Sequence, residues 1–173
     1  MGSEYDAPEV GVCILPPARG GRGSKIIMAD IETVRQVFSA NQRFYEAFES
    51  LDIQRMAAVW RQDKAVQCIH PGWSPLIGWQ PVRDSWVRIF NNARSMTFQI
   101  TDPHITVQGS VAWVVCIERI TMAIDEAQQE TQVLATNIFV QRDDRPAEHR
   151  WLMVHHHGSP MFQRLPETDD SDD

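Results

Sequence analysis

The chain has 173 residues, of which 43% are hydrophobic, and it carries six tryptophans and a net charge of −7. This length and composition fit one ordinary domain with tails and enough apolar material for a packed core. An acidic chain without a basic stripe is not expected to bind nucleic acid or anionic membranes, and no apolar run approaches the roughly 20 residues that span a bilayer.

The two ends of the chain differ from its middle. Residues 1–27 are predicted to be a disordered leader, because PPARGGRGS combines Pro-Pro with Gly-rich sequence. Met28 opens the first helical segment and is a candidate biological start. The folded domain is expected over residues 28–163, and residues 164–173 are predicted to be a solvated acidic tail.

The first half of the domain has the periodicity of helices. Apolar residues recur at helical spacing from Ile31 to Leu51, which predicts a long first helix to about Ser50. Asp52 is well placed to cap a short second helix. The segment AVQCIHPG indicates a short strand, and Pro81 suits the first turn of a third helix, PVRDSWVRIFNNA.

The second half alternates with a period of two residues. Four long strands are predicted in MTFQITDPHITVQ, VAWVVCIERITMAI, TQVLATNIFVQR and HRWLMVHHHGS. The short polar connections between them are typical of hairpins, so the sheet should be antiparallel. Helices followed by a run of strands form the α+β pattern.

This order of elements resembles the NTF2-like superfamily, which includes the SnoaL-like proteins and the ketosteroid isomerases. FYEAFESLDIQRMAAVW resembles its opening helix pair, and PLIGWQPVRDSW resembles its glycine followed by the third helix. The resemblance covers about residues 30–160. It implies a cone-shaped NTF2-like (cystatin-like) fold, with three N-terminal helices packed on a strongly curved antiparallel sheet.

The C-terminal half is similar to the association (hub) domain of calcium/calmodulin-dependent kinase II. WLMVHHHGS resembles the Trp-x-x-Val-His-x-His-x-Ser ending of the hub, and DPHITVQGSVAWVVCIERIT resembles two of its strands. Arg119 matches one of the arginines with which the hub binds small carboxylates, and Asn137 stands where another would be. The resemblance implies that Arg119 points into the cavity, with Trp113 on the same strand face.

An apolar wall with one cation suits an anionic or carbonyl-bearing small molecule. Asn137 on the following strand would donate a hydrogen bond to the same ligand. The alternative for Arg119 is an ion pair with an internal acid such as Glu49, because a buried arginine needs a partner.

His70 is the candidate catalytic residue. An imidazole exchanges protons near neutral pH, and His70-Pro71 occupies the place where ketosteroid isomerases carry their base, an aspartate before a proline. The resemblance places His70 at the mouth of the cone, where Trp73 and Trp79 would line an apolar pocket. The alternative is that His70 only hydrogen-bonds the loop backbone.

The run His155–His157 follows the apolar segment WLMV, so it belongs to a strand and is not a purification tag. Alternation places His155 and His157 on one face of that strand and His156 on the other. Two same-face histidines can share a metal ion, but zinc requires more ligands than two. We therefore predict no metal and expect His155 and His157 to bind ligand in the cavity.

The three cysteines, Cys13, Cys68 and Cys116, are odd in number and widely spaced. They lack the paired spacing of a zinc site. We interpret them as reduced thiols in a cytoplasmic protein, and the sequence predicts no cofactor.

Two functions remain open. The first is a binding or assembly module whose cavity takes a small apolar or anionic organic molecule. The second is an isomerase, cyclase or dehydratase with His70 as general base. The first is favoured, because the oxyanion tyrosine of the isomerases falls at Phe44 here and Tyr45 is expected to point about 100° away on the helix.

The convex face of the sheet is predicted to form a homodimer, because broad apolar patches usually mark interfaces and dimers are the commonest closed assemblies. The even-numbered strand residues are expected there, with His156 in or near the contact. They are Val114, Cys116, Ile120, Leu134, Ile138, Leu152 and Val154.

Overall fold

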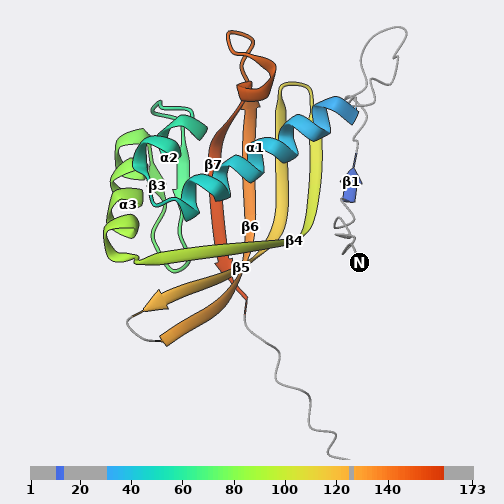
Figure 1. Cartoon of the computed structure of the whole chain (residues 1–173). Helices are drawn as coiled ribbons and strands as arrows, with labels where there is room; N and C mark the ends of the chain where they lie inside the picture. The colour runs from blue at the N-terminus through green and yellow to red at the C-terminus, as the bar shows by residue number, and fades with distance from the viewer. Residues whose placement is uncertain (1–10, 14–30, 125–126, 162–173) are drawn as a thin grey trace, which may run out of the picture.

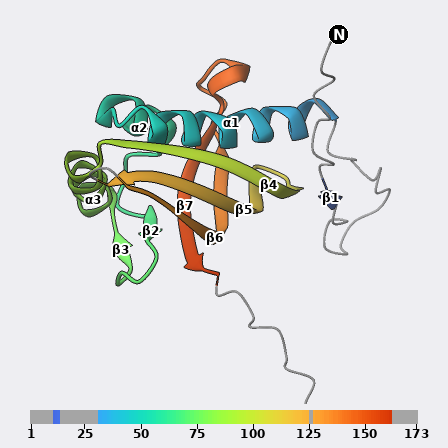
Figure 2. The same ribbon diagram turned by 60° about the horizontal axis from the view of Figure 1, so that its bottom comes forward.

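The computed structural model of the chain describes residues 11–13, 31–124 and 127–161. Within these residues three helices lie against one sheet, and the long helix crosses one face of the long strands (Figure 1). A second view places this helix and the short helix after it on the same side of the sheet (Figure 2). The α+β architecture predicted from the order of elements is confirmed.

The first two helices begin and end close to the predicted positions. α1 spans Ile31–Glu49 and α2 spans Ile53–Val59. The Asp52 carboxylate accepts hydrogen bonds from the backbone N–H groups of Gln54, at 2.7 Å, and Arg55, at 3.3 Å. Asp52 is therefore the predicted cap of the second helix, since it satisfies two N–H groups that the first turn leaves unpaired.

The third helix, α3, spans Trp79–Asn92 and begins slightly earlier than predicted. Gly78 precedes it with a φ of +88°, a conformation that glycine adopts without steric cost. Pro81 lies in the first turn, as predicted, where its missing N–H costs no hydrogen bond.

The described strands form one sheet in the order β1-β4-β5-β6-β7-β2-β3. Their bounds are β1 Gly11–Cys13, β2 Gln67–Ile69, β3 Leu76–Ile77, β4 Ser95–Gln108, β5 Val111–Ile124, β6 Ala127–Gln141 and β7 Trp151–Pro160. The four long strands pair antiparallel, as predicted. The short strand β2 instead joins β7 in parallel, and a 3-10 turn at Ala147–His149 precedes β7.

β4 contains a bulge that interrupts its pairing with β5. The register shifts between Thr101 and His104, and Asp102 has a positive φ of 51°. Pro103 sits inside this bulge, where a residue without a backbone N–H does not break the ladder. A bulge of this kind bends the strand that contains it.

The predicted leader and acidic tail lie outside the described residues, with one exception. Residues 11–13 form β1, which pairs in parallel with residues 104–106 of β4, so this part of the leader differs from the expectation. Among the described helices, none has both the length and the apolar character needed to cross a membrane.

The inner face of the sheet, which contacts α1, carries the even-numbered residues of β5. Val114, Cys116, Ile120 and His156 were expected at the convex contact but are 0%, 1%, 8% and 2% exposed. The reason is the register: Val114 pairs with Asn137, whose side chain hydrogen-bonds α1. The prediction that the even-numbered residues of β5 and His156 lie on the convex face is wrong, because they lie on the inner face.

The outer face of the sheet points away from α1. By the strand register it comprises Trp113, Val115, Ile117 and Arg119 of β5, Leu134, Thr136 and Ile138 of β6, and His155 and His157 of β7. Leu134 and Ile138 were predicted to lie on this face, and they do. Leu134 is 44% exposed, so the outer face presents apolar surface to solvent.

Aromatic side chains pack the space between the helices and the inner face. The Phe48 ring lies 4.5 Å from that of Phe98 and 4.8 Å from that of Trp86, measured between ring centroids. Phe44 and Phe90 also contact Trp86. The core roles predicted for Trp86, Phe90 and Phe98 are confirmed.

Candidate functional site

A cluster of polar side chains lies in the middle of this apolar inner face. We call Asn41, Tyr45, Glu118, Asn137 and His156 the inner polar cluster. None of the five is more than 5% exposed. They come from α1, β5, β6 and β7, so the fold and not the local sequence brings them together.

Hydrogen bonds join the residues of the inner polar cluster, and the donors follow one another from His156 to Glu118. Asn137 Oδ1 only accepts, so His156 donates to it from Nδ1 at 2.7 Å. Asn137 Nδ2 donates to Asn41 Oδ1 at 2.8 Å and to the Tyr45 hydroxyl at 3.1 Å. The Tyr45 hydroxyl in turn donates to Glu118 Oε1 at 2.8 Å. The cluster therefore presents a chain of donors that ends on the carboxyl group of Glu118.

Tyr45 reaches the cluster although its neighbour Phe44 is also buried. Phe44 packs against Trp86 of α3, whereas Tyr45 points at β5 and β6. α1 therefore buries a wide arc, because α3 and the sheet contact different sides of it. Tyr45 therefore points in a different direction from Phe44, as expected for neighbouring helix residues, and both side chains remain in the interior.

Burial changes the proton affinity of the acidic groups in the cluster. It raises the pKa of Glu118 to about 7, and the hydrogen bond from Tyr45 only partly opposes this shift. Burial, followed by the nearby carboxyl of Glu118, raises the pKa of the Tyr45 phenol well above its usual value. Among the described residues, no cation lies within ion-pair distance of Glu118.

Desolvation acts in the opposite direction on the histidines. Burial, with smaller contributions from the other histidines, lowers the pKa of His156 to about 3. Burial also lowers the pKa of His70 to about 4. Both imidazoles are therefore neutral at physiological pH, and a neutral imidazole has the base form that proton abstraction requires.

His70, the predicted catalytic residue, is 4% exposed and follows β2. Ser85 gives its hydroxyl proton to the carbonyl of Val82 at 2.7 Å, so His70 Nε2 donates to Ser85 Oγ at 2.9 Å. The partner is thus a side chain of α3 and not the loop backbone. The rings of Trp73 and Trp86 lie 5.0 Å and 4.7 Å away and enclose the imidazole.

His70 borders the inner polar cluster without a direct hydrogen bond to it. Its ring centroid lies 6.4 Å from that of His156, and Trp86 contacts both rings. Asn137 belongs to the cluster itself. Two of the predicted site residues, His70 and Asn137, are therefore in the same interior region.

The other predicted ligand-binding residues lie elsewhere. Trp73 is 36% exposed and covers His70 from the loop after β2. Trp113 and His155 share one row of the outer face, because both pair with Ile138. His155 and His157 face each other with ring centroids 6.3 Å apart. The expectation that these two histidines line the interior of the cone is wrong.

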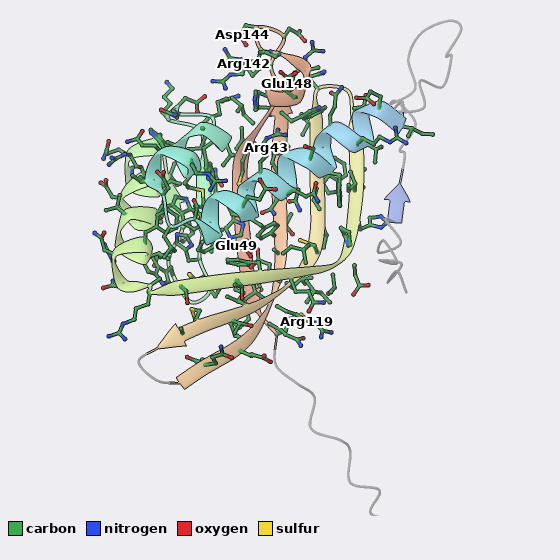
Figure 3. All side chains as sticks on the ribbon, in the orientation of Figure 1. Arg43, Glu49, Arg119, Arg142, Asp144 and Glu148 are labelled. Carbon is green, nitrogen blue, oxygen red and sulfur yellow. The ribbon has the colours of Figure 1, made fainter. Side chains whose placement is uncertain are left out.

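Arg119 also lies on the outer face, because its neighbour Glu118 points inward at Tyr45 and successive strand residues alternate. The predicted inward orientation of Arg119 is therefore wrong. Glu49, its alternative partner, instead accepts a hydrogen bond from the backbone N–H of Phe98 at 2.7 Å. The side chains of Glu49 and Arg119 are labelled in Figure 3.

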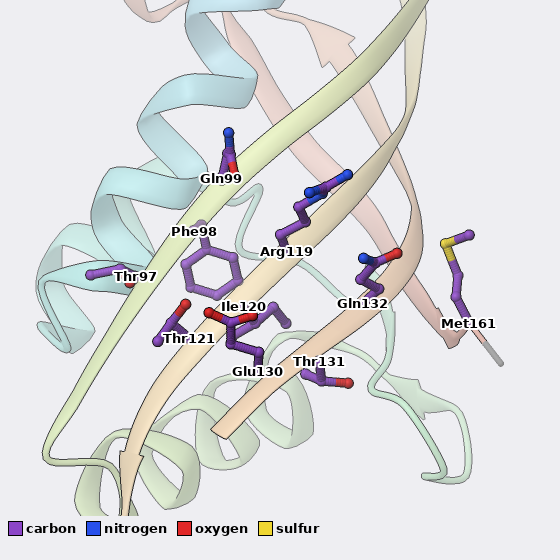
Figure 4. A pocket seen from close by; sticks show the side chains of 10 residues that line it. All are labelled: Thr97, Phe98, Gln99, Arg119, Ile120, Thr121, Glu130, Thr131, Gln132 and Met161. Atoms are coloured by element: carbon purple, nitrogen blue, oxygen red, sulfur yellow. The ribbon is translucent and has the colours of Figure 1, made fainter. Parts of the chain in front are cut away.

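A pocket of about 630 Å³ surrounds Arg119 at the lower end of β4, β5 and β6 (Figure 4). Gln99 and Gln132 flank Arg119 in the same row of the sheet, and Thr121 and Glu130 form the next row. This lining is mainly polar. The Arg119 pocket offers a small polar ligand the donors of Arg119 and the acceptor oxygens of Glu130.

The sequence contained a weak signal for the residues that it did not identify. Glu118 is the only charged member of the otherwise apolar alternating set Val114, Cys116 and Ile120. Asn41 and Tyr45 are four residues apart, a spacing that places both side chains on the same side of a helix. A polar residue within an apolar alternating set indicates a functional role more strongly than a polar residue on an exposed surface does.

The family model described as a SnoaL-like domain matches residues 37–163. The chain is 30% identical over 130 residues to the F-box protein SKIP8 of Arabidopsis thaliana. These aligned residues cover 75% of this chain and 52% of that protein. The chain thus spans about half the length of this curated relative.

Solved structures give the same grouping. A proposed dehydratase of the NTF2-like family from Streptomyces avermitilis is 33% identical, with a TM-score of 0.68 over 75% of this chain and 96% of that chain. A proposed calcium/calmodulin-dependent protein kinase type II association domain from Thiobacillus denitrificans is also 33% identical, with a TM-score of 0.63 over 71% of this chain and 93% of that chain. Both resemblances predicted from the sequence are confirmed.

Proposed function

Because this chain belongs to the SnoaL-like domain family, we propose that it is a self-associating binding module, in which two copies pair through their outer sheet faces. The observation that carries the proposal is the apolar centre of that face. Trp113 and Ile138 form one of its rows, and Ile117 and Leu134 form another. An apolar face with a polar border suits contact with a second copy of the same chain.

Polar groups border this centre on two sides. His155 and His157 flank it on β7, and Arg119 lies beyond Ile117 on β5. Burial, followed by the neighbouring His157, lowers the pKa of His155, which favours its neutral form in a contact. One of the similar structures is described as an association domain, which agrees with assembly as a role.

The packed interior supports assembly over catalysis. Phe48, Trp86 and Phe98 occupy the space beneath α1, and Trp73 and Trp86 enclose His70. The predicted small anionic ligand then has its best place in the Arg119 pocket, which opens at the end of the outer face. A ligand there would lie next to the proposed contact between subunits.

Light scattering of the purified chain at micromolar concentration tests the proposal. We expect twice the 19.8 kDa mass of one chain. Hydrogen exchange should also be slower on β5 and β6 at high than at low protein concentration, because the outer face is covered only in the dimer. A monomer throughout this range would contradict self-association.

A second candidate is an isomerase, cyclase or dehydratase that uses His70 as general base. The inner polar cluster favours it, because a buried carboxyl with a pKa near 7 beside a phenol is a common feature of acid–base sites. One similar structure is described as a proposed dehydratase. In this alternative Asn137, and not Arg119 on the opposite face, would stabilise a developing oxyanion.

Titration of His70 by long-range proton–nitrogen NMR separates the two candidates. We expect its imidazole to remain neutral from pH 8 to about pH 5, because burial lowers its pKa to about 4. His70→Asn identifies the signal. A pKa close to the ordinary value of 6.5 would show that solvent reaches the ring, and would favour the enzyme.

A further inference from the structure

A second pocket lies between the C-terminal end of α3 and the paired strands β4 and β5. Its volume is about 250 Å³, and we call it the α3 groove. Ile89, Met96 and Met122 supply apolar walls, and Trp73 and Arg88 form its border with the loop after β2. None of these residues belongs to the outer face or to the Arg119 pocket.

Arg88 is the cation of this groove. Its guanidinium carbon lies 5.2 Å from the centre of the Trp73 ring. A guanidinium above an aromatic face keeps the N–H groups at its edge available for a carboxylate. In the described part of the chain, no carboxylate lies within ion-pair distance of Arg88. The groove therefore holds a positioned fork of donors without an anionic partner.

The local charge has the same sign. Residues 88–95, at the C-terminal end of α3, contain two arginines and no acid, so this segment carries a charge of +2 in a chain whose net charge is −7. Charges of one sign around a pocket raise the local concentration of ligands of the other sign. An anion is thus attracted to this end of α3.

We propose that the α3 groove binds a small apolar carboxylate. The apolar body would lie between Trp73, Ile89 and the two methionines, and the carboxylate would accept hydrogen bonds from Arg88. Methionine side chains adapt to ligands of irregular shape. The volume of about 250 Å³ suits a ligand of one or two rings, because drug-sized ligands fill about 300–1,000 Å³.

The groove is coupled by contact to the predicted catalytic region. Trp73 forms one wall of the groove and also packs on the ring of His70, with 5.0 Å between the centroids. A ligand in the groove would change the environment of the Trp73 indole directly. The Trp73 signal is therefore a specific reporter of binding at this place.

Naphthalene-2-carboxylate and its neutral carboxamide are suitable probes for the full-length chain. We expect the acid to shift the indole N–H signal of Trp73 in proton–nitrogen NMR, with Trp73→Phe to identify that signal. The amide should bind about tenfold more weakly, since it lacks a charge-assisted hydrogen bond. Arg88→Gln should reduce the affinity for the acid to that for the amide.

Arg83→Gln is the matched control, because Arg83 is on the same helix but does not line the groove. It should leave the affinities for both probes unchanged. Equal affinities for acid and amide, unchanged binding by Arg88→Gln, or no shift of Trp73 at millimolar acid would overturn the proposal. The mass of the wild-type chain by light scattering is a separate readout, so this result does not depend on the proposed self-association.

Discussion

Ile117→Glu is expected to give a folded monomer at concentrations where the wild-type chain is a dimer. Ile117 lies in the apolar centre of the outer face, where it pairs with Thr101 and Leu134. In a two-fold dimer each substitution is present twice, and burial of an unpaired carboxylate is costly. We expect the dissociation constant to rise at least about a hundredfold, or about 3 kcal/mol, as measured by sedimentation or light scattering.

Val114→Glu is the matched control on the same strand. Val114 is 0% exposed on the inner face, so its replacement places a carboxylate in the core and not in the contact. We expect this variant to lose its near-ultraviolet circular dichroism and to unfold at room temperature. The pair distinguishes the two faces: a dimeric Ile117→Glu variant, or a folded and dimeric Val114→Glu variant, would show that the proposed face is wrong.

The order and bounds of the elements were largely predictable because their signals are local. The segment VAWVVCIERITMAI coincides with β5, Val111–Ile124. Asp52 caps α2 through contacts with residues only two and three positions away. The parallel addition of β2 to β7 was not predictable, since no local pattern joins strands that are far apart in the sequence.

The faces of β5 were not predictable because both are apolar. Trp113, Val115 and Ile117 form one alternating set, and Val114 and Cys116 belong to the other. Alternation separates two such sets but does not identify the one that contacts a helix. A charged residue such as Glu118 is usually expected on the solvent-exposed face of a sheet. Here its carboxyl group lies on the inner face, where it accepts a hydrogen bond from Tyr45.

The inner polar cluster depends on tertiary structure in the same way. Tyr45 and Glu118 are 73 residues apart, and Asn41 and Asn137 are 96 apart. Each is a reasonable surface residue when its neighbours in the sequence are considered alone. Their buried contacts follow from the crossing of α1 over β5 and β6, which periodicity does not specify.

Glu118→Gln is expected to make the domain more stable than the wild type above pH 7. Burial raises the pKa of Glu118 from its ordinary value of 4.5 to about 7, so between these values the unfolded chain releases a proton that the folded chain retains. The contribution of Glu118 to the free energy of unfolding is therefore complete below pH 4.5 and falls as the pH rises to 7. The slope is about 1.4 kcal/mol per pH unit.

His70 and His156 have the opposite dependence. Their folded-state pKa values, about 4 and about 3, lie below the ordinary value of 6.5, so their contribution falls as the pH decreases below 6.5. These histidine contributions are the same in both proteins, so they cancel when the free energy of unfolding of the wild type is subtracted from that of Glu118→Gln. This difference should therefore increase from pH 4.5 to pH 7 by about 3 kcal/mol and then remain constant.

Glutamine retains an oxygen that accepts the hydrogen bond of Tyr45, so the substitution changes charge more than packing. Urea unfolding at pH 4.5, 6 and 8 measures the difference, at one protein concentration because self-association affects apparent stability. Glu130→Gln, an exposed carboxyl on the neighbouring strand β6, should show no comparable gain. A constant difference from pH 4.5 to 8 would contradict the raised pKa. A gain at pH 8 would instead mean that the chain keeps a buried carboxyl against its own stability, as expected of a group retained for binding or proton transfer.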